Sequence, residues 1–169
     1  KTHTTLPASW RIFPRDYLRS GYDRGHCKSA DDSEDTQENA DSSFLMSNIL
    51  PQLPDLNRVC WRRLEATVKS VVIESDEAII VTGPIFQSAL CTIGEDDRIV
   101  VPGGCYKVVA VRKGATWKTY SFTAMQHFRD ESLGQLSVPL RTVEQLSGFE
   151  FFPKLNLTRD QKSEVATLP

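Results

Sequence analysis

A short run near the start of the chain gathers residue types that hydrolysis of a phosphate ester needs. The run reads Tyr22-Asp23-Arg24-Gly25-His26. Histidine can act as a general base because its imidazole titrates near neutral pH. Arginine presents a planar fork that matches a phosphate, and glycine lets the backbone turn where a side chain would clash. The run alone is a weak signal, because a lone histidine is more often a structural hydrogen-bonding residue.

Three further polar residues offer oxygen ligands for a hard divalent cation. Asn48 ends an expected strand, Asn57 opens an expected helix, and Glu65 lies eight residues further on. Eight residues span about 800° of helix, which places Asn57 and Glu65 ~80° apart on the same flank, with Trp61 between them. Mg²⁺ keeps several waters and takes few protein ligands, so one amide with supporting polar groups suffices. Taken singly, each residue is more often structural than a ligand: Asn57 as a helix cap, Glu65 as a surface acid and Asn48 as a turn residue.

The elements expected around these residues combine strands with helices. Apolar and β-branched runs predict strands over residues 43–48, 78–81, 99–101, 106–112 and 117–124. Helical periodicity extends from residue 56 to about 72, with a core face of Cys60, Leu64, Thr67 or Val68, and Val71. Arg58, Arg62 and Lys69 fall on a different, basic face. The mixture predicts an α+β domain with a mixed or antiparallel sheet and flanking helices.

The remaining segments are expected to be short helices or loops. The acidic run 31–41 is typical of a solvated loop, and Pro51 and Pro54 predict a turn or an irregular connection. Residues 142–146, stopped by Gly148, predict a short helix. Residues beyond Phe152 show weak periodicity, so we expect a domain over 1–153 and a C-terminal surface tail over 154–169.

Composition excludes some functions and leaves others open. The chain has 169 residues, 40% of them hydrophobic, and no apolar run near the ~20 residues that a membrane helix needs. Twenty basic against 22 acidic residues give a formal charge of −2, which argues against a generally basic nucleic-acid binder. The charge is uneven, however. Acids gather between residues 31 and 41, while arginines surround the polar residues described above: Arg15, Arg19, Arg24, Arg58 and Arg62.

Four cysteines are widely spaced, and none forms a C-x-x-C pair of the kind that binds zinc. They are Cys27, Cys60, Cys91 and Cys105. A Cys91–Cys105 disulfide is one expectation, because the two residues bracket a loop containing Gly, Asp and Pro between two expected strands. Four free, half-buried thiols are the alternative.

Several motifs in a fixed order resemble the DNA/RNA non-specific endonucleases, the ββα-metal or His-Me finger nucleases that include endonuclease G. The resemblance covers roughly residues 6 to 153. Its motifs are Ser20-Gly21-Tyr22-Asp23-Arg24-Gly25-His26, Phe44 through Gln52, Asn57, Trp61, Leu64-Glu65, Val81-Thr82-Gly83-Pro84, Val101-Pro102, Tyr106-Lys107 and Gly148 through Phe152.

The resemblance implies a role for each matching residue. His26 matches the general base that activates water, and Asn57 matches the direct ligand of one Mg²⁺, with Mn²⁺ or another divalent cation as alternatives. Glu65 and Asn48 match residues that act at the site by holding the waters of the metal. Arg24 matches an arginine that contacts phosphate or stabilises the transition state. Three residues are expected to be structural at the site: Asp23, Gly25 and Trp61. Arg58 and Arg62 are expected to join Arg24 in binding substrate.

Two departures from the family pattern stand out. Family members usually have about sixty further residues before the matching region, which supply early strands and another arginine. We therefore expect these N-terminal strands to be missing here, and a separate N-terminal fragment could complete the sheet. Cys27-Lys28-Ser29 follows His26 where the family usually has an apolar residue, a small residue and Pro. Cys27 could be half of a disulfide, an oxidation-sensitive thiol or a packing residue, and we favour a structural role.

The sequence therefore predicts a metal-dependent endonuclease that acts on both DNA and RNA. A catalytically weakened nuclease fold that binds nucleic acid or a protein partner is the alternative. We also expect a second copy of the chain, in a homodimer, or an inhibitor protein as a partner. We expect no association with a membrane. A non-specific nuclease endangers its own genome, so we expect a secreted or periplasmic location, with a mitochondrial location as the alternative.

Overall fold

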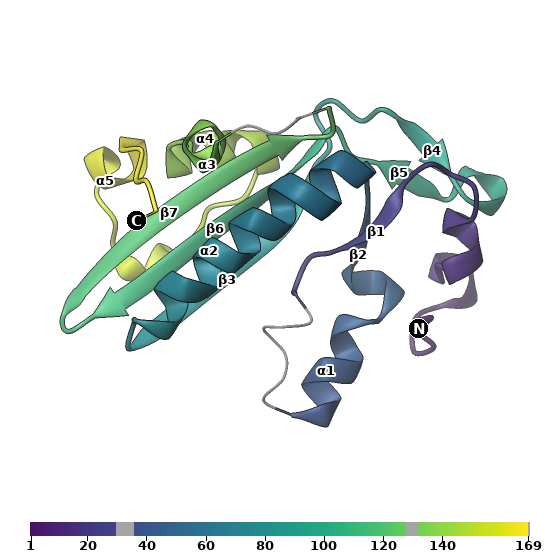
Figure 1. Cartoon of the computed structure of the whole chain (residues 1–169), viewed down its shortest axis with the longest axis horizontal. Coiled ribbons are helices and arrows are strands. Elements are labelled where there is room, and N and C mark those ends of the chain that lie inside the picture. The colour runs from purple at the N-terminus through teal and green to yellow at the C-terminus, as the bar shows by residue number, and fades with distance from the viewer. Residues whose placement is uncertain (30–35, 128–131, 169) are drawn as a thin grey trace.

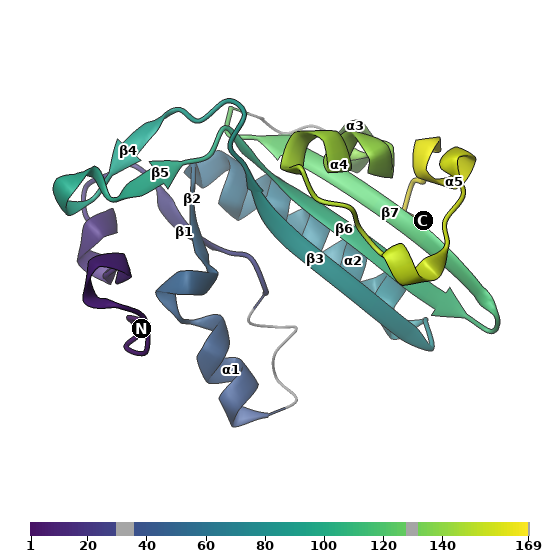
Figure 2. The ribbon, with the colours of Figure 1, turned by 180° about the vertical axis from the view of Figure 1, so that it is seen from behind.

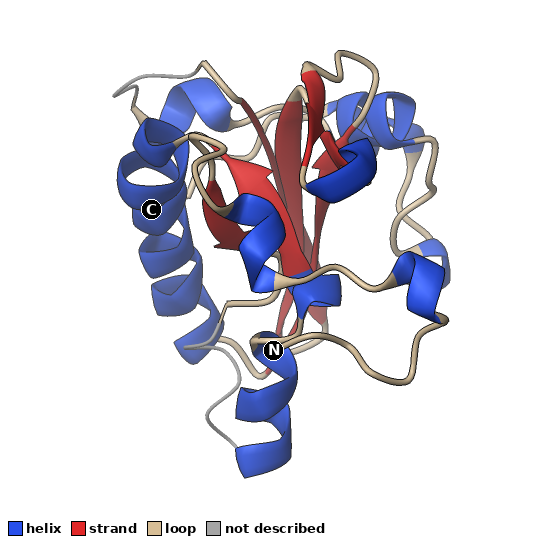
Figure 3. Cartoon of the chain, turned by 90° about the vertical axis from the view of Figure 1, so that its right-hand side faces the viewer, coloured by secondary structure: helices blue, strands red, loops and turns tan. Residues whose placement is uncertain are grey.

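The structure is a computed structural model that describes residues 1–29, 36–127 and 132–168. Its main sheet is antiparallel, in the order β3 (Glu77–Ile85), β6 (Gly104–Lys113), β7 (Thr116–Met125). Helix α2 (Arg62–Ile73) runs along one face, and α4 (Leu140–Ser147) crosses the other (Figures 1 and 2). Seen along its edge in Figure 3, the sheet has helices on both sides, which is the α+β arrangement predicted from the sequence.

Strand β6 lies at the centre of the core, because both faces of the sheet are covered along this strand. Alternate residues of a strand point to opposite faces. One set packs with α2 and consists of Cys105, Val109 and Val111; the other packs with α4 and consists of Tyr106, Val108 and Ala110. Lys107 belongs to the α2 set and is only 1% exposed. A charged residue therefore occupies a core position directly beneath the helix.

A smaller unit lies at one end of this sheet (Figure 1). It contains the hairpin β1 (Asp23–His26) and β2 (Ile49–Gln52), and the ribbon β4 (Cys91–Ile93) and β5 (Ile99–Val101). Short helices complete it: η1 (Ala8–Trp10), η2 (Pro14–Tyr17), α1 (Gln37–Ser43), η4 (Met46–Asn48) and η6 (Glu95–Asp97). A separate apolar cluster holds it together, made of Tyr17, Met46, Ile93, Ile99 and Val101.

The connection from β2 to α2 fixes the hairpin to the main sheet. It contains one π-helical segment, η5 (Leu56–Trp61), which continues directly into α2. The buried side chain of Gln126, just beyond β7, accepts a hydrogen bond from the Leu53 amide at 2.8 Å. Its Nε2 donates to the carbonyls of Pro51 at 2.7 Å and Pro102 at 3.2 Å. One side chain thus joins the end of β2, the start of the helix and the chain between β5 and β6.

Most of the predicted elements are confirmed. The helix from residue 56 exists, with Cys60, Leu64 and Val68 buried, and the four strands predicted after residue 77 lie within β3, β5, β6 and β7. The helix before Gly148 is α4, and Gly148 adopts the left-handed conformation that ends it (φ 77°). The strand predicted over 43–48 is wrong, because that segment contains the end of α1 and all of η4. Pro51 lies inside β2, where a hairpin edge tolerates it.

The acidic run and the C-terminal segment also differ from expectation. Asp31, Asp32, Glu34 and Asp35 lie outside the described residues, and the run continues into helix α1 instead of a loop. Beyond residue 152 the chain forms η7 (Pro153–Leu155) and α5 (Arg159–Ser163), not a free tail. Leu155 and Leu157 pack on the α4 side, and Ala166 and Leu168 pack on the α2 side. These apolar residues are too sparse in the sequence to show periodicity, but they still pack against the two core clusters.

The predicted Cys91–Cys105 disulfide is wrong. None of the four cysteines forms a disulfide bond, as the alternative expected, but two of them are buried and one is exposed. Cys91 is exposed on β4 opposite Val101, whereas Cys105 is fully buried on β6 between Pro84 and Ala124. Burial raises the pKa of the Cys105 thiol to about 12. The bracketing loop places the two residues in separate sheets, which the sequence spacing could not show.

Replacing Gln126 by Leu should weaken the whole fold. The change removes a buried acceptor and donor, and so leaves the Leu53 amide and the Pro51 carbonyl without that partner. Each buried polar group left unpaired costs about 1–3 kcal/mol, so the free energy of unfolding should fall by about 3 kcal/mol. Urea denaturation measures this directly. The exposed Gln145→Leu change should have almost no effect, and equal stability of the two variants would contradict the role given to Gln126.

Candidate active site

Strand β1 carries the motif residues on two faces. It pairs with β2 so that Asp23 lies opposite Gln52 and His26 opposite Ile49. Gly25 is buried, and a Cβ atom there would lie 2.0 Å from the Gln52 side-chain oxygen. Gln52 itself is buried and donates from Nε2 to the Cys105 sulfur at 3.3 Å. A side chain at position 25 would therefore collide with Gln52, which its bond to Cys105 holds against the main sheet.

His26 stands at the end of β1 and is half-buried. Its Nε2 is buried, and the structure shows no hydrogen-bond partner for it. The ring of Phe44 packs against it at 89°, with centroids 5.6 Å apart. Burial and then the nearby charge of Arg24 lower the pKa of His26 below its usual 6.5. The imidazole is therefore unprotonated at neutral pH and can accept a proton.

Asp23 organises the first turn of the helix. Its carboxylate accepts two hydrogen bonds from Arg58, each 2.7 Å, and one from Asn57 Nδ2 at 3.1 Å. The bonds from Arg58 are the main reason that the pKa of Asp23 falls below its usual value. Because Nδ2 of Asn57 is engaged, its Oδ1 is the atom that can face a cation. Arg58, predicted to bind substrate, already has its guanidinium paired with Asp23.

Glu65 faces a buried lysine. Lys107 Nζ lies 4.0 Å from Glu65 Oε1, donates to Thr82 Oγ1 at 2.9 Å, and stands 5.4 Å from the centre of the Trp61 ring. The side chain of Lys107 is 2% exposed and that of Glu65 is 24% exposed. A buried charge costs free energy unless other groups compensate it. Glu65, Thr82 and Trp61 provide this compensation and hold the ammonium beneath the carboxylate.

Asn48 ties together the chain on either side of the hairpin. Its Oδ1 accepts from the Lys28 amide, and its Nδ2 donates to the carbonyls of Lys28 and Ser43, all at 2.8–2.9 Å. The Asn48 carbonyl also accepts from the Cys27 amide at 2.9 Å. Burial raises the pKa of Cys27 to about 11, so this thiol beside the histidine stays protonated and unreactive. These contacts fix the backbone that follows His26.

Arg24 links the surroundings of His26 with those of Asn57. A cavity of about 230 Å³ is lined by His26, Arg24 and Phe44. A second cavity, of about 560 Å³, is lined by Arg24, Asn57 and Tyr22 among others. Arg62, on the outer side of α2, is exposed and lines neither cavity. Arg24 therefore borders both the cavity of the candidate base and that of the candidate metal ligand, whereas Arg58 and Arg62 line neither.

The donors present suit a hydrated cation. Among the described residues, no cluster of three or more His, Cys, Asp or Glu side chains could enclose a metal ion. Asn57 Oδ1, fixed by its bond to Asp23, is a hard oxygen ligand, and the Glu65 carboxylate is partly exposed on the same helix. Mg²⁺ binds through few protein oxygens and retains its waters, so this donor set fits it.

Two further side chains support the site, Lys107 and Gln126, and sequence reasoning assigns neither of them a role. Lys107 was part of the family motif, but its buried place beneath Glu65 depends on the register of β6 against β3 (Thr82 opposite Lys107). The available signal for Lys107 is a lysine within an otherwise apolar run of strand residues. Gln126, which joins β2 to the sheet, follows a predicted strand and gave no signal at all.

An antiparallel hairpin with a histidine at its end, followed by a helix with an amide and a carboxylate, defines the ββα-metal class of nuclease folds. Residues 1–158 match the DNA/RNA non-specific endonucleases, and the chain belongs to that family. A nuclease of Nostoc sp. is 42% identical over 109 residues, which cover 63% of this chain and 38% of that protein.

A mitochondrial nuclease and a solved structure are also similar to this chain. The human mitochondrial nuclease EXOG is 28% identical over 176 residues, covering 95% of this chain and 48% of that protein. An endonuclease G chain, from a structure described as the EndoG/EndoGI complex and the mechanism of EndoG inhibition, superposes with a TM-score of 0.84 at 27% identity. The match covers 95% of this chain and 70% of that chain. The chain spans about half the length or less of these two curated relatives.

Two substitutions of Lys107 should separate the contribution of its aliphatic stem to stability from that of its charge. Lys107→Ala leaves a cavity under Trp61, and large-to-small core changes cost about 2–5 kcal/mol. Lys107→Met keeps the stem, and exchanging a buried charge for an apolar group of similar size costs much less. Urea unfolding of both variants measures the difference. Equal losses of stability in the two variants would contradict a stem that packs against Trp61.

Proposed function

We propose that this chain is a Mg²⁺-dependent endonuclease that hydrolyses phosphodiester bonds in both DNA and RNA. The observation that carries the proposal is His26, a neutral imidazole with a buried, unpartnered Nε2, next to an arginine that borders both cavities. Family membership supports the class of reaction.

In this proposal each side chain has a defined task. His26 Nε2 takes a proton from the attacking water, and Arg24 binds the phosphate and balances the charge that grows on it. Asn57 Oδ1 holds the cation directly, and Glu65 and Asn48 hold its waters. A bound divalent cation supplies charge neutralisation at the phosphate and at the departing 3′ oxygen. Asp23 keeps the Asn57 amide turned toward the cation.

Sugar independence follows from which atoms these residues can reach. Guanidinium, imidazole and amide groups at the site are suited to phosphate oxygens, which DNA and RNA share. Recognition of RNA alone would need a contact to the 2′ hydroxyl. The proposal therefore includes both nucleic acids as substrates. Mn²⁺ or another divalent cation would be an alternative to Mg²⁺.

Partners and location remain part of the proposal. An inhibitor protein is a candidate partner, supported by the EndoG structure whose description names an inhibition complex, and a homodimer stays a prediction. No helix in the described part of the chain is long and apolar enough to span a bilayer. Export or a periplasmic location stays the first expectation, and the mitochondrial nuclease EXOG supports the alternative of a mitochondrial location.

Removal of the base should abolish cleavage without unfolding the protein. His26→Ala deletes the proton acceptor, and loss of a general base costs about 10²–10⁴-fold in rate. The measurement is nicking of supercoiled plasmid with Mg²⁺, alongside thermal unfolding. His127→Ala, an exposed histidine beyond β7, serves as the matched control and should keep full activity. EDTA should stop the wild type. Full activity of His26→Ala would overturn the mechanism.

The pH dependence should follow the lowered pKa of His26. The base must be unprotonated, so kcat/KM should fall on the acid side with a midpoint below 6.5. Because the folded state resists protonation of His26, the stability of the wild type should also fall as pH drops through 6.5. Initial rates on a labelled oligonucleotide between about pH 5 and 8 measure the first effect. A midpoint above 6.5 would contradict the role of burial.

A further inference from the structure

The cavity beside Asn57 is lined by several arginines whose guanidinium groups differ in their pairing. Arg15, Arg19 and Arg24 line it, with Tyr17, Tyr22 and Asn57. Elsewhere in the described chain, Arg58, Arg98 and Arg112 form ion pairs with carboxylates. Arg19 and Arg24 make no ion pair or hydrogen bond with any described residue, and both are exposed. Two uncompensated cations therefore face one cavity.

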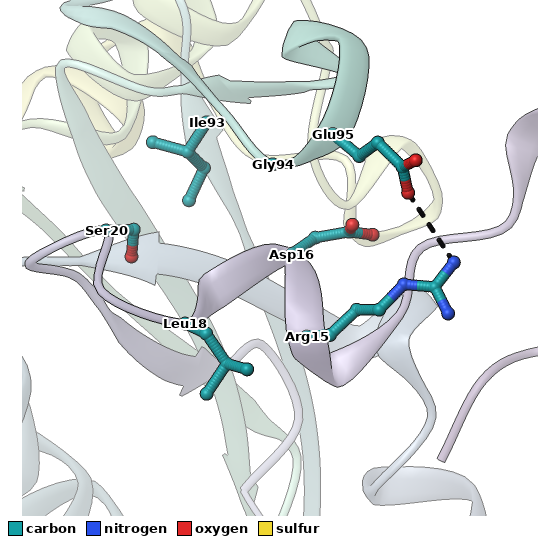
Figure 4. A pocket seen from close by; sticks show the side chains of 7 residues that line it. All are labelled: Arg15, Asp16, Leu18, Ser20, Ile93, Gly94 and Glu95. Carbon is teal, nitrogen blue, oxygen red and sulfur yellow. Dashed lines mark ion pairs between the residues drawn. The ribbon is translucent and has the colours of Figure 1, made fainter.

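Among the described residues, the one acid that lines this cavity is already paired. The Asp23 carboxylate accepts three hydrogen bonds from Arg58 and Asn57. Asp16 is buried, accepts from the Phe13 amide at 2.8 Å through one oxygen only, and lines the neighbouring cavity instead of this one. Glu95 pairs with Arg15 at 3.5 Å across a neighbouring cavity of about 410 Å³, as Figure 4 shows. The charge left over in the cavity is therefore positive and belongs to Arg19 and Arg24.

Arg19 is held in a backbone conformation that arginine seldom adopts. Its φ is 58°, in the left-handed region that favours glycine. The turn around it is closed by Ser20, whose amide and hydroxyl both donate to the Tyr17 carbonyl and whose hydroxyl accepts from the Tyr22 amide. Tyr17 is buried in the apolar cluster of the smaller unit. The arginine is thus fixed at the cavity by a strained turn anchored in the core.

A non-glycine residue in this conformation destabilises the fold, and such residues concentrate where a ligand is held. Glycine at position 19 would relieve the strain at no steric cost, and the neighbouring Gly21 is in the left-handed region too (φ 83°). The side chain that remains at position 19 is a cation turned toward a cavity with two more arginines. The strained backbone at Arg19 therefore points to a bound ligand. The positive charge of the cavity points to an anion as that ligand.

We propose that Arg19, with Arg24 and more weakly Arg15, binds the backbone phosphate next to the scissile one on the same nucleic-acid strand. This inference rests on the proposed nuclease function. The reacting phosphate belongs near Arg24, which borders both the His26 and the Asn57 cavities. A phosphate at Arg19 is therefore its neighbour along the strand. Contact to phosphate alone carries no base information, which suits a sequence-independent enzyme.

Arg19→Gly tests the proposal because it changes stability and binding in opposite directions. The variant should unfold at the same temperature as the wild type or higher, because the strain is relieved. Its affinity for a short fluorescein-labelled DNA duplex in EDTA should fall about tenfold at low salt. The plot of log affinity against log salt should lose about 0.9 of its slope, the value for one phosphate contact. Fluorescence anisotropy measures both quantities without cleavage.

Two matched controls isolate the charge and the backbone change. Asn156→Gly alters another left-handed residue (φ 49°), directly after η7, without loss of charge. Arg159→Gln removes one exposed positive charge in α5, at the opposite end of the long axis from β1 (Figure 1). Both variants should bind the duplex like the wild type. Arg15→Gln should have a smaller effect than Arg19→Gly, because Glu95 already pairs with it.

The possible outcomes separate the inference from the function on which it rests. A wild type that binds the duplex but never cleaves it with Mg²⁺ would refute the nuclease function and leave the phosphate site standing. Unchanged affinity and salt slope in Arg19→Gly, or an equal loss in Arg159→Gln, would overturn the site. Inorganic phosphate exchanged for chloride at equal ionic strength distinguishes a free ion from a nucleic-acid phosphate. Displacement of the duplex by phosphate that is weaker in Arg19→Gly than in the wild type would support the site, and equal displacement in both would overturn it.

Discussion

The candidate site depends on the attachment of a two-stranded hairpin to a sheet with which it shares no backbone ladder. An isolated hairpin of four residues a strand is marginal in water. Here Gln126 bonds to the backbone at Pro51, Leu53 and Pro102, and Gln52 contacts Cys105 through the space that Gly25 leaves open. Both side chains are buried, so each bond is protected from competition by water. The position of His26 relative to Asn57 is set by these amides.

The same sheet supports the carboxylate half of the site. Because β6 is central and α2 covers one of its faces, the residues of the α2 set are buried. Lys107 occupies such a position, and its charge is compensated by groups from three elements: Glu65 of α2, Thr82 of β3 and the Trp61 ring of η5. Desolvation makes each of these interactions stronger than at the surface. The result is a carboxylate on a rigid helix with a fixed positive group beneath it.

The sequence predicted well whatever depends on local periodicity. The helix carrying Asn57 and Glu65 and the strands of the main sheet have long, regular patterns, and they are confirmed. The strand predicted over 43–48 failed because short apolar runs fit a 3-10 turn equally well, and the disulfide failed because loop spacing does not specify sheet membership. Arg58 shows the same limit in the site. Its place on the basic face was visible, but its two bonds to Asp23 depend on how the hairpin crosses the helix.

In the proposed phosphate site, charge and strain act together, and they would let a slightly acidic chain hold a polyanion. The overall charge of −2 says little about the site, because it averages over the whole chain, whereas the cavity holds Arg19 and Arg24, which form no ion pair with a described residue. Holding Arg19 at φ 58° costs the fold about 1–2 kcal/mol, which the buried Tyr17 and the Ser20 bonds offset. A glycine there would give a more stable turn and a less positive cavity. Stability alone therefore does not account for the arginine, whereas attraction for a phosphate does.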